Sequence, residues 1–210
     1  MAARYSLPSD LWDTARLNTR LVRPAPLALQ AGAACGYEGV WQMAVLGSGV
    51  EVRAGAGMAV LQARVLVAVD SSDVIIGLVP AQASVADNQY PGVAGAVGGG
   101  CGWGGSGAVC WTLPGPAPSD SDPVCFGQGD RVMVVLDCRA EPIVRLLVNG
   151  QPRLVHTLAD TPTSTLTLCP AIALLGDECG GAACVELEPA GLRQGWDAPP
   201  PPLDPDMTSD

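Results

Sequence analysis

The chain has 210 residues, a formal net charge of −10, 11 arginines and no lysine. This length suits one large all-β domain, or one domain with tails. An acidic chain repels phosphate backbones, so nucleic-acid binding would need a local basic patch, and the cluster of Arg16, Arg20 and Arg23 is too sparse to form one. No apolar run reaches the roughly 18 residues of a membrane-spanning helix. We therefore expect neither a nucleic-acid nor a membrane partner.

The two ends of the chain differ in composition from its middle. Residues 1–34 hold one short stretch with helical spacing, "LWDTARLNTRL", and we expect them to form an extension that packs on the domain. They lack an apolar signal core, which favours an intracellular, cytoplasmic protein; their arginines also fit a mitochondrial presequence, but Asp10 and Asp13 argue against one. Residues 191–210 are rich in proline and aspartate and are expected to be disordered or extended.

Eight cysteines raise the question of disulfides or a metal site. Disulfide frameworks belong to secreted chains, and no secretion signal is present. Cys138 and Cys169 lie in apolar strand patterns, where free cysteine packs as a small hydrophobe. Because the chain has no C-x-x-C motif and a single histidine, His156, we expect reduced thiols, no metal and no cofactor. The alternative is a four-cysteine zinc site, which would combine Cys101, Cys110, Cys179 and Cys184.

Beyond the N-terminal extension, the sequence is typical of short strands separated by Gly, Pro, Asp or Ser. The first three expected strands are residues 41–46, 58–70 and 74–79. The second alternates in polarity, with Val65 and Val67 predicted on one face. The polar break "DSSD" between the second and third has the length of a hairpin turn.

Residues 91–110 form the one glycine-rich segment. They contain a nominal G-x-G-x-x-G at Gly102, Gly104 and Gly107. Prolines follow where a phosphate-binding motif requires a helix, and the chain has no lysine to serve a P-loop. We therefore interpret the segment as a loop that enters a strand at "AVCWTL".

The stretch from 129 to 152 carries the clearest strand pattern. "RVMVVLD" is apolar on both faces, which suits a strand deep in a sandwich. In "IVRLLVN", Val144, Leu146 and Val148 share one apolar face. The pair Asn149–Gly150 follows and favours a tight turn, because both residues tolerate a positive φ.

Three further strands complete the series, at "PRLVHTL", "STLTLCPAIALLG" and "CVELE". On the first of them, His156 shares its face with Leu154 and Leu158, which favours a packed structural role over catalysis. Roughly ten short strands joined by loops predict an antiparallel β-sandwich.

Five motifs follow one another in order: "DVIIGLV" at 73–79, "GWGGSG" at 102–107, "GDRVMVVLD" at 129–137, "IVRLLVNGQ" at 143–151 and "LCPAIALLG" at 168–176. Together they resemble the SPRY domain family, over roughly residues 35–190. The most specific feature is "GD…LD" followed by "NG" at this spacing. The chain departs from the family pattern in two places: leucine stands where the hairpin usually has phenylalanine, and no tyrosine follows "GWG".

The resemblance implies a bent antiparallel β-sandwich, a concanavalin-like jelly roll, over residues 35–190. It also implies a domain without catalytic activity that binds a protein or short peptide through loops at one edge. Asp130 and Asp137 are then structural residues at strand ends, whereas a catalytic carboxylate pair would have to flank a cleft.

Two aromatic residues are candidate binding anchors because they stand in loop-like sequence: Tyr90 in "DNQYPG" and Trp103 in "GWGGSG". Aromatic side chains bury much area at low entropic cost. Either could equally be a core or hinge residue. Trp41 and Trp111 lie in strand patterns, where a core position is favoured, and the two remaining tryptophans are expected to pack the termini.

Three functions are compatible with these features. The first is a non-enzymatic protein-interaction module, an adaptor whose partner is a protein or peptide. The second is a structural subunit of a large assembly, with the N-terminal segment and the acidic tail as docking arms. The third is a carbohydrate-binding or hydrolytic sandwich, which would need several exposed aromatic and acidic residues in one groove, and the sequence offers few.

Overall fold

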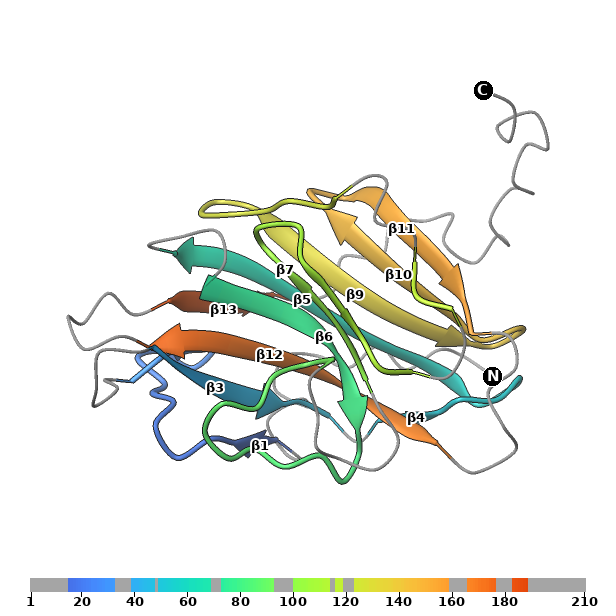
Figure 1. Cartoon of the computed structure of the whole chain (residues 1–210), viewed down its shortest axis with the longest axis horizontal. Coiled ribbons are helices and arrows are strands. Elements are labelled where there is room, and N and C mark those ends of the chain that lie inside the picture. Colours follow the sequence, from blue (N-terminus) through green and yellow to red (C-terminus); the bar gives the residue numbers. More distant parts are fainter. Residues whose placement is uncertain are drawn as a thin grey trace.

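The computed structural model describes residues 15–32, 39–47, 49–68, 73–92, 100–113, 116–118, 123–158, 166–176 and 183–188. Within these ranges the regular elements are strands, which form two antiparallel sheets stacked as a β-sandwich (Figure 1). The predicted fold class is confirmed. None of the described residues belongs to a helix long and apolar enough to cross a membrane.

Sheet A is the sheet in front in Figure 1 and has seven described strands. Their order is β1 (Arg16–Leu17), β3 (Val40–Val45), β12 (Thr167–Gly176), β6 (Val74–Pro80), β7 (Cys101–Gly104) and β8 (Val109–Trp111), and β4 (Val50–Glu51) pairs with one end of β12. Strand β12 is central because both its faces are apolar. Leu168 and Ile172 face the core between the sheets, while Ala171 and Ala173 belong to a second cluster on the outer face.

Sheet B has six described strands. Their order is β11 (Gln151–Thr157), β10 (Ile143–Val148), β9 (Arg131–Cys138), β5 (Gly57–Val67), β13 (Cys184–Glu188) and β2 (Ala28–Gln30). The register places Leu61, Val134 and Leu146 side by side, and all three are fully buried against sheet A. This is the inward apolar face that the period-two pattern predicts.

The turn between β10 and β11 has the predicted conformation, with φ of 53° at Asn149 and 76° at Gly150. Asp130 ties this turn to the start of β9. Its Oδ1 accepts a hydrogen bond from Asn149 Nδ2 at 2.7 Å, and its Oδ2 accepts one from the Gly127 N–H at 2.8 Å. Asp130 therefore does what was expected of a structural residue at a strand end.

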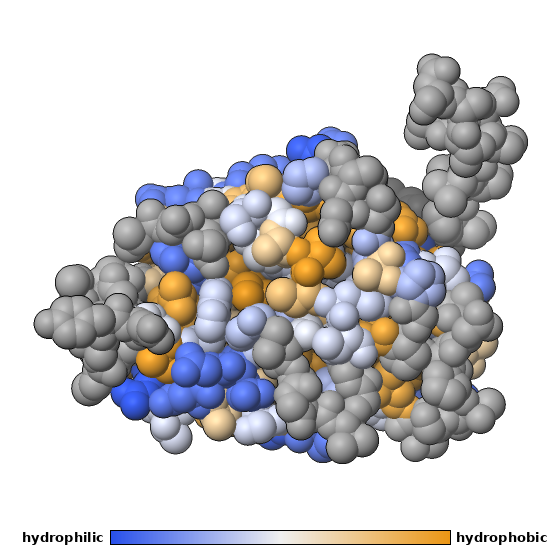
Figure 2. Space-filling model, in the orientation of Figure 1, coloured by the Kyte–Doolittle hydropathy of each residue, from blue (hydrophilic) through white to orange (hydrophobic). Residues whose placement is uncertain are grey.

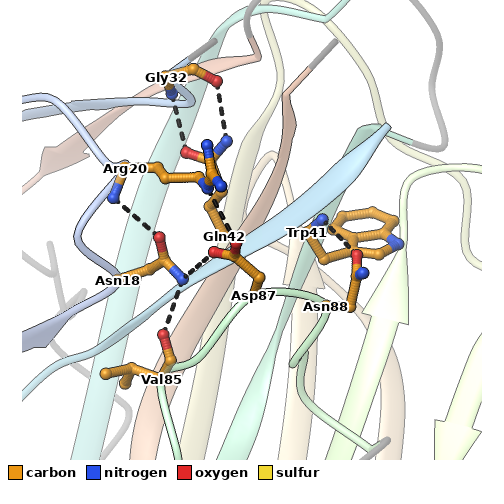
Figure 3. Close-up of polar contacts among 8 residues, drawn as sticks. All are labelled: Asn18, Arg20, Gly32, Trp41, Gln42, Val85, Asp87 and Asn88. Carbon is orange, nitrogen blue, oxygen red and sulfur yellow. Dashed lines mark hydrogen bonds and ion pairs between the residues drawn. The ribbon is translucent and has the colours of Figure 1, made fainter. Parts of the chain in front are cut away.

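One buried polar side chain joins the two sheets near β2 and β3. Gln42 is fully buried, and its amide makes both of its hydrogen bonds to the backbone of Gly32 (Figure 3). Its Oε1 accepts from the Gly32 N–H and its Nε2 donates to the Gly32 carbonyl, each at 2.8 Å. Because both ends of the amide are satisfied, its burial costs little.

Two expectations about single segments are wrong. The glycine-rich segment is not a loop throughout, because Cys101–Gly104 form β7 and pair with β6 and β8. The alternation of β5 does not reach its end: a register shift lies opposite Cys184 and Val185, and Val67 is 43% exposed whereas Val65 is buried.

The predicted terminal segments fall only partly within the described residues. The described part of 1–34 contributes β1 to sheet A and β2 to sheet B. Residues 191–210, together with Trp12, Trp196, Cys35 and Cys179, lie outside the described residues. The cysteines that the structure describes, Cys101, Cys110, Cys125, Cys138, Cys169 and Cys184, are free.

Candidate binding site

The outer face of sheet A is crossed by the segment that follows β6, residues 81–92, which we call the strap. Its Ala83 is 1% exposed and packs in one apolar cluster with Met43 of β3 and Ala171 of β12. Figure 1 shows the strap in green, in front of the strands of sheet A. Figure 2 shows hydrophobic surface on this side of the molecule in several separate places rather than in one large patch.

Arg16 of β1 and Asn18, which follows β1, hold one side of the strap by its backbone. Arg16 donates from its guanidinium to the Ala83 carbonyl at 2.7 Å. Asn18, which is 3% exposed, donates from Nδ2 to the Val85 carbonyl at 2.8 Å (Figure 3). These bonds satisfy strap carbonyls that have no partner in a sheet.

Asp87 provides a second attachment to the same segment. Asn18 Nδ2 donates to its Oδ1 at 3.0 Å, and Arg20 Nε donates to its Oδ2 at 2.9 Å (Figure 3). The hydrogen bonds from Asn18 and Arg20 lower the pKa of the Asp87 carboxyl below its ordinary value. Two of the three arginines of the sparse cluster, Arg16 and Arg20, thus bind the protein's own strap.

The strap then pairs with the edge of β3. The Asn88 N–H donates to the Trp41 carbonyl at 2.9 Å, and the Trp41 N–H donates to Asn88 Oδ1 at 3.2 Å (Figure 3). Asn88 has a φ of 60°, a left-handed conformation that asparagine adopts more readily than most residues. Beside this contact the rings of Trp41 and Tyr90 pack with centroids 5.3 Å apart, and both side chains are half-buried.

A row of glycines forms the floor under the end of the strap. Gly77 of β6 and Gly102 of β7 are directly paired across the sheet. A Cβ on Gly77 would be 2.8 Å from Pro91 Cβ, and one on Gly102 would overlap the Pro91 carbonyl. The backbone of Pro91 can therefore lie close to the sheet only because Gly102 lacks a side chain, while a side chain at Gly77 would clash first with the Cys101 carbonyl of β7 and then with the Pro91 ring.

The structure places the two predicted anchors in different surroundings. Tyr90 lies in the strap, half-buried beside Trp41, and burial raises the pKa of its hydroxyl. Trp103 lies in β7 and is 1% exposed, so the expectation that it stands in a loop is wrong. Its indole belongs to the core between the sheets, where Trp111 packs edge-on at 6.4 Å between ring centroids. Whether either residue binds a partner stays a prediction.

Trp41 and Trp111 were expected in the core, but both are only half-buried. Trp111 lies on β8, at one edge of sheet A, and packs edge-on against His156 of β11, at the corresponding edge of sheet B, with ring centroids 4.7 Å apart. Burial lowers the pKa of His156. This contact fits the structural role predicted for the histidine.

Among the described residues, no group of three or more His, Cys, Asp or Glu side chains is placed to hold a metal ion. Asp137 is 7% exposed and accepts hydrogen bonds from Arg145 at 3.1 Å and from Arg139 at 2.9 Å. Both acids of the possible pair, Asp130 and Asp137, therefore bind neighbouring groups of the fold.

The sequence points to Tyr90 but not to the residues that position it. Asn18, Asp87 and Asn88 lie far from their partners in the chain, and no local pattern links them. The one available signal is the composition of "ADNQYPG", in which Asn, Asp, Pro and Gly favour a folded loop over an extended one.

No family model matches the sequence, and no curated protein matches it. Solved structures do match the fold. A human SPRY domain is similar with a TM-score of 0.58 and 12% identity, over 83% of this chain and 98% of its own. The carbohydrate recognition domain of Emp46p in its potassium-bound form is similar with a TM-score of 0.54 and 9% identity, over 90% of this chain and 98% of its own.

Lectin I-B4 from Griffonia simplicifolia, in its metal-free form, is similar with a TM-score of 0.50 and 14% identity, over 86% of this chain and 92% of its own. At such low identities these likenesses establish the fold and nothing more. The chain is therefore a concanavalin-like β-sandwich of the kind found in SPRY domains and in lectins. The SPRY-type sandwich expected from the sequence motifs is confirmed.

Proposed function

We propose that this chain is a non-catalytic binding module for a protein or short peptide, and that the partner docks on Trp41, Tyr90 and the strap. The observation that carries the proposal is the half-buried ring pair beside a strap that hydrogen bonds and a glycine floor hold in place. Two aromatic rings that are already held in place offer a large contact area and lose little conformational entropy when a partner binds.

The polar surroundings suit peptide recognition. The exposed strap residues next to Tyr90 include Asp87 and Asn88, and the exposed Arg20 side chain lies beside Asp87. Such a rim of polar groups around aromatic anchors gives orientation and excludes water from the centre of an interface. A partner with an apolar or aromatic residue flanked by polar groups fits this surface.

A peptide library selected on the full chain tests the proposal. A selected peptide should bind Tyr90→Ala more weakly than the wild type by about 1–4 kcal/mol, as measured by calorimetry. The matched control is Val155→Ala, which removes an exposed side chain from sheet B and should leave the affinity unchanged. Equal affinity for the wild type and Tyr90→Ala would show that the partner surface lies elsewhere.

The likeness to two carbohydrate-binding structures supports a second candidate function, the recognition of a glycan. A glycan array probed with the same three proteins separates the two. Binding to a defined glycan, with no peptide selected, would overturn the proposed peptide partner and favour the lectin-like function. Thermal melting of each variant confirms that a lost signal does not come from unfolding.

A further inference from the structure

Two tryptophans at one edge of the sandwich carry hydrogen-bond donors that the described part of the chain does not satisfy. The indole nitrogens of Trp103 and Trp111 are shielded from solvent, and neither has a hydrogen-bond partner among the described residues. An indole has one N–H donor and no acceptor, so each side chain leaves its whole hydrogen-bonding capacity unused. A buried donor without a partner costs free energy, and native proteins satisfy most such groups with protein atoms or ordered water.

One further shielded nitrogen without a partner occurs among the described residues, on Arg16, and its situation is different. The Arg16 guanidinium already donates to the Ala83 carbonyl from its other terminal nitrogen, at 2.7 Å. Each indole, in contrast, has a single donor. The rings of Trp103 and Trp111 also pack against each other, with centroids 6.4 Å apart. Two unsatisfied donors in one pair of touching rings indicate a common polar site.

The pairing of β7 with β8 directs both indoles into the same space. Trp111 is in register with Cys101, which lies two residues before Trp103 on β7, so the three side chains share one face of sheet A. This face is the inner one, because Cys101 and Trp103 belong to the core between the sheets. Strand β8 is at the edge of sheet A, so the indoles lie where the core reaches the side of the sandwich.

His156 brings an acceptor to the same place from sheet B. It is in register with the fully buried Val144, so it faces inward, and its ring packs on Trp111 with centroids 4.7 Å apart. Burial lowers the pKa of His156 despite a hydrogen bond to the Pro116 backbone, so the imidazole is neutral at pH 7. Because a proline backbone offers only its carbonyl, this bond uses the ring N–H, and the other ring nitrogen is an acceptor.

We propose that Trp103, Trp111 and His156 hold internal water between the β8 and β11 edges of the two sheets. Water accepts hydrogen bonds from the two indole N–H groups and donates one to the imidazole, which matches the two donors and one acceptor of the site. Water held in this way joins sheet A to sheet B, as the Gln42 amide does near β2 and β3. The site is on the inner face of sheet A, whereas the strap is on the outer face, so this inference does not depend on the proposed function.

Nuclear magnetic resonance of the full chain, labelled with nitrogen-15 in its five tryptophans, tests the proposal. Variants in which one tryptophan becomes phenylalanine assign the indole N–H signals. The indole protons of Trp103 and Trp111 should show dipolar cross-peaks with water, and a rotating-frame experiment separates these by their sign from chemical exchange. If both protons lack a water contact, the N–H groups bind another part of the chain or a ring face, and the proposal is overturned.

A sulfur analogue of tryptophan tests the same site through stability. 3-Benzothienylalanine has the shape of tryptophan with sulfur in place of the N–H, so it removes the donor without creating a cavity. In place of Trp103 or Trp111 it should shift the urea midpoint to a lower concentration, because the internal water loses a partner. The matched control is Trp41, whose indole nitrogen is not among the shielded, unpartnered atoms, and its replacement should leave the midpoint unchanged. A higher midpoint at positions 103 and 111 would show that the donors are unsatisfied in the wild type, which contradicts the proposal.

His156→Phe tests the assigned acceptor, because it keeps an aromatic ring against Trp111 and removes both ring nitrogens. The water cross-peaks of both indoles should weaken in this variant, and unchanged cross-peaks would contradict the role of His156. If a substituted chain fails to fold, the wild-type measurement still decides, since the water contacts of Trp103 and Trp111 are expected in the unaltered protein.

Discussion

Trp103 and Tyr90 are both large aromatic residues, but they differ in burial. Replacing the fully buried Trp103 by alanine leaves a cavity between the sheets, so we expect Trp103→Ala to lower the free energy of unfolding by about 3–5 kcal/mol. Tyr90→Ala removes a half-buried ring from the outer face and should cost clearly less. Urea denaturation of the two variants measures the difference.

The reverse order would contradict this assignment. If Trp103→Ala were as stable as the wild type while Tyr90→Ala unfolded, the indole would be the accessible side chain and the phenol the core residue. Leu146→Ala provides the reference for a fully buried residue of sheet B, with an expected loss of about 2–5 kcal/mol.

Asp137 links stability to pH. Burial alone would raise the pKa of its carboxyl, but hydrogen bonds from Arg139 and Arg145, together with the charge of Arg139, outweigh burial and lower it. A carboxyl whose pKa is lower in the folded state stabilises the fold at every pH above its unfolded-state pKa, which is about 3.9. This contribution is lost as the pH falls through the lower, folded-state pKa.

We therefore expect Asp137→Asn to cost about 3–5 kcal/mol at neutral pH, because Arg145 is left buried without its counter-charge. The difference between wild type and variant should shrink as the pH falls below about 4. Denaturation curves measured from pH 7 to pH 2 show this convergence. A difference that stays constant down to pH 2 would exclude the ion pair as its source.

At the residue scale, the sequence identified the structural acids and the packed histidine, but it placed Trp103 in a loop, whereas this residue lies in β7. Asp130 and Asn149 could be predicted because their roles are local, at a strand end and a tight turn. The position of Trp103 could not be predicted, because the glycines on both sides of it are typical of a loop. One of them, Gly102, instead lets the strap approach the sheet. The burial of a side chain on β7 depends on packing against other strands, which the sequence around position 103 does not reveal.

At the scale of elements, the glycine floor gives a sharp prediction. In Gly102→Ala the new Cβ would overlap the Pro91 carbonyl and lie 2.9 Å from Ile75 Cγ2, so the strap must move away from the sheet. We expect a loss of about 1–3 kcal/mol and changed fluorescence of the Trp41–Tyr90 pair.

Gly127→Ala is the matched control, because a Cβ there meets nothing within 4 Å and no positive φ is involved. It should leave both stability and fluorescence unchanged. An equal effect of the two substitutions would show that close approach of the strap is not the reason for glycine at position 102.

Strands were predictable as elements, whereas the strap was not. Nearly continuous apolar runs in β9, β10 and β12 reflect burial on both faces, and the alternation in β13 reflects burial on one face; both patterns are visible in the chain itself. The strap is held by hydrogen bonds from residues 67 positions away, such as those of Asn18 to Val85. Contacts between residues this far apart leave no local pattern in the sequence.

At the scale of the whole molecule, the last two strands complete both sheets. Strand β12 lies between β3 and β6 in sheet A, and β13 lies between β2 and β5 in sheet B. Each therefore bridges strands that come much earlier in the chain, so neither sheet can form its full set of hydrogen bonds until residues 167–188 are present.

A chain that ends at Leu158 should consequently stay unfolded. It retains β9, β10 and β11, but its sheet A lacks the central strand, and the core residues Leu61 and Ile76 lose the partners supplied by β12 and β13. We expect no cooperative urea transition and rapid exchange of backbone amides throughout. A chain that ends at Glu188 keeps the thirteen strands found among the described residues and should unfold cooperatively. Cooperative unfolding of the shorter chain would mean that β12 and β13 are additions to a self-sufficient sandwich rather than the strands that close it.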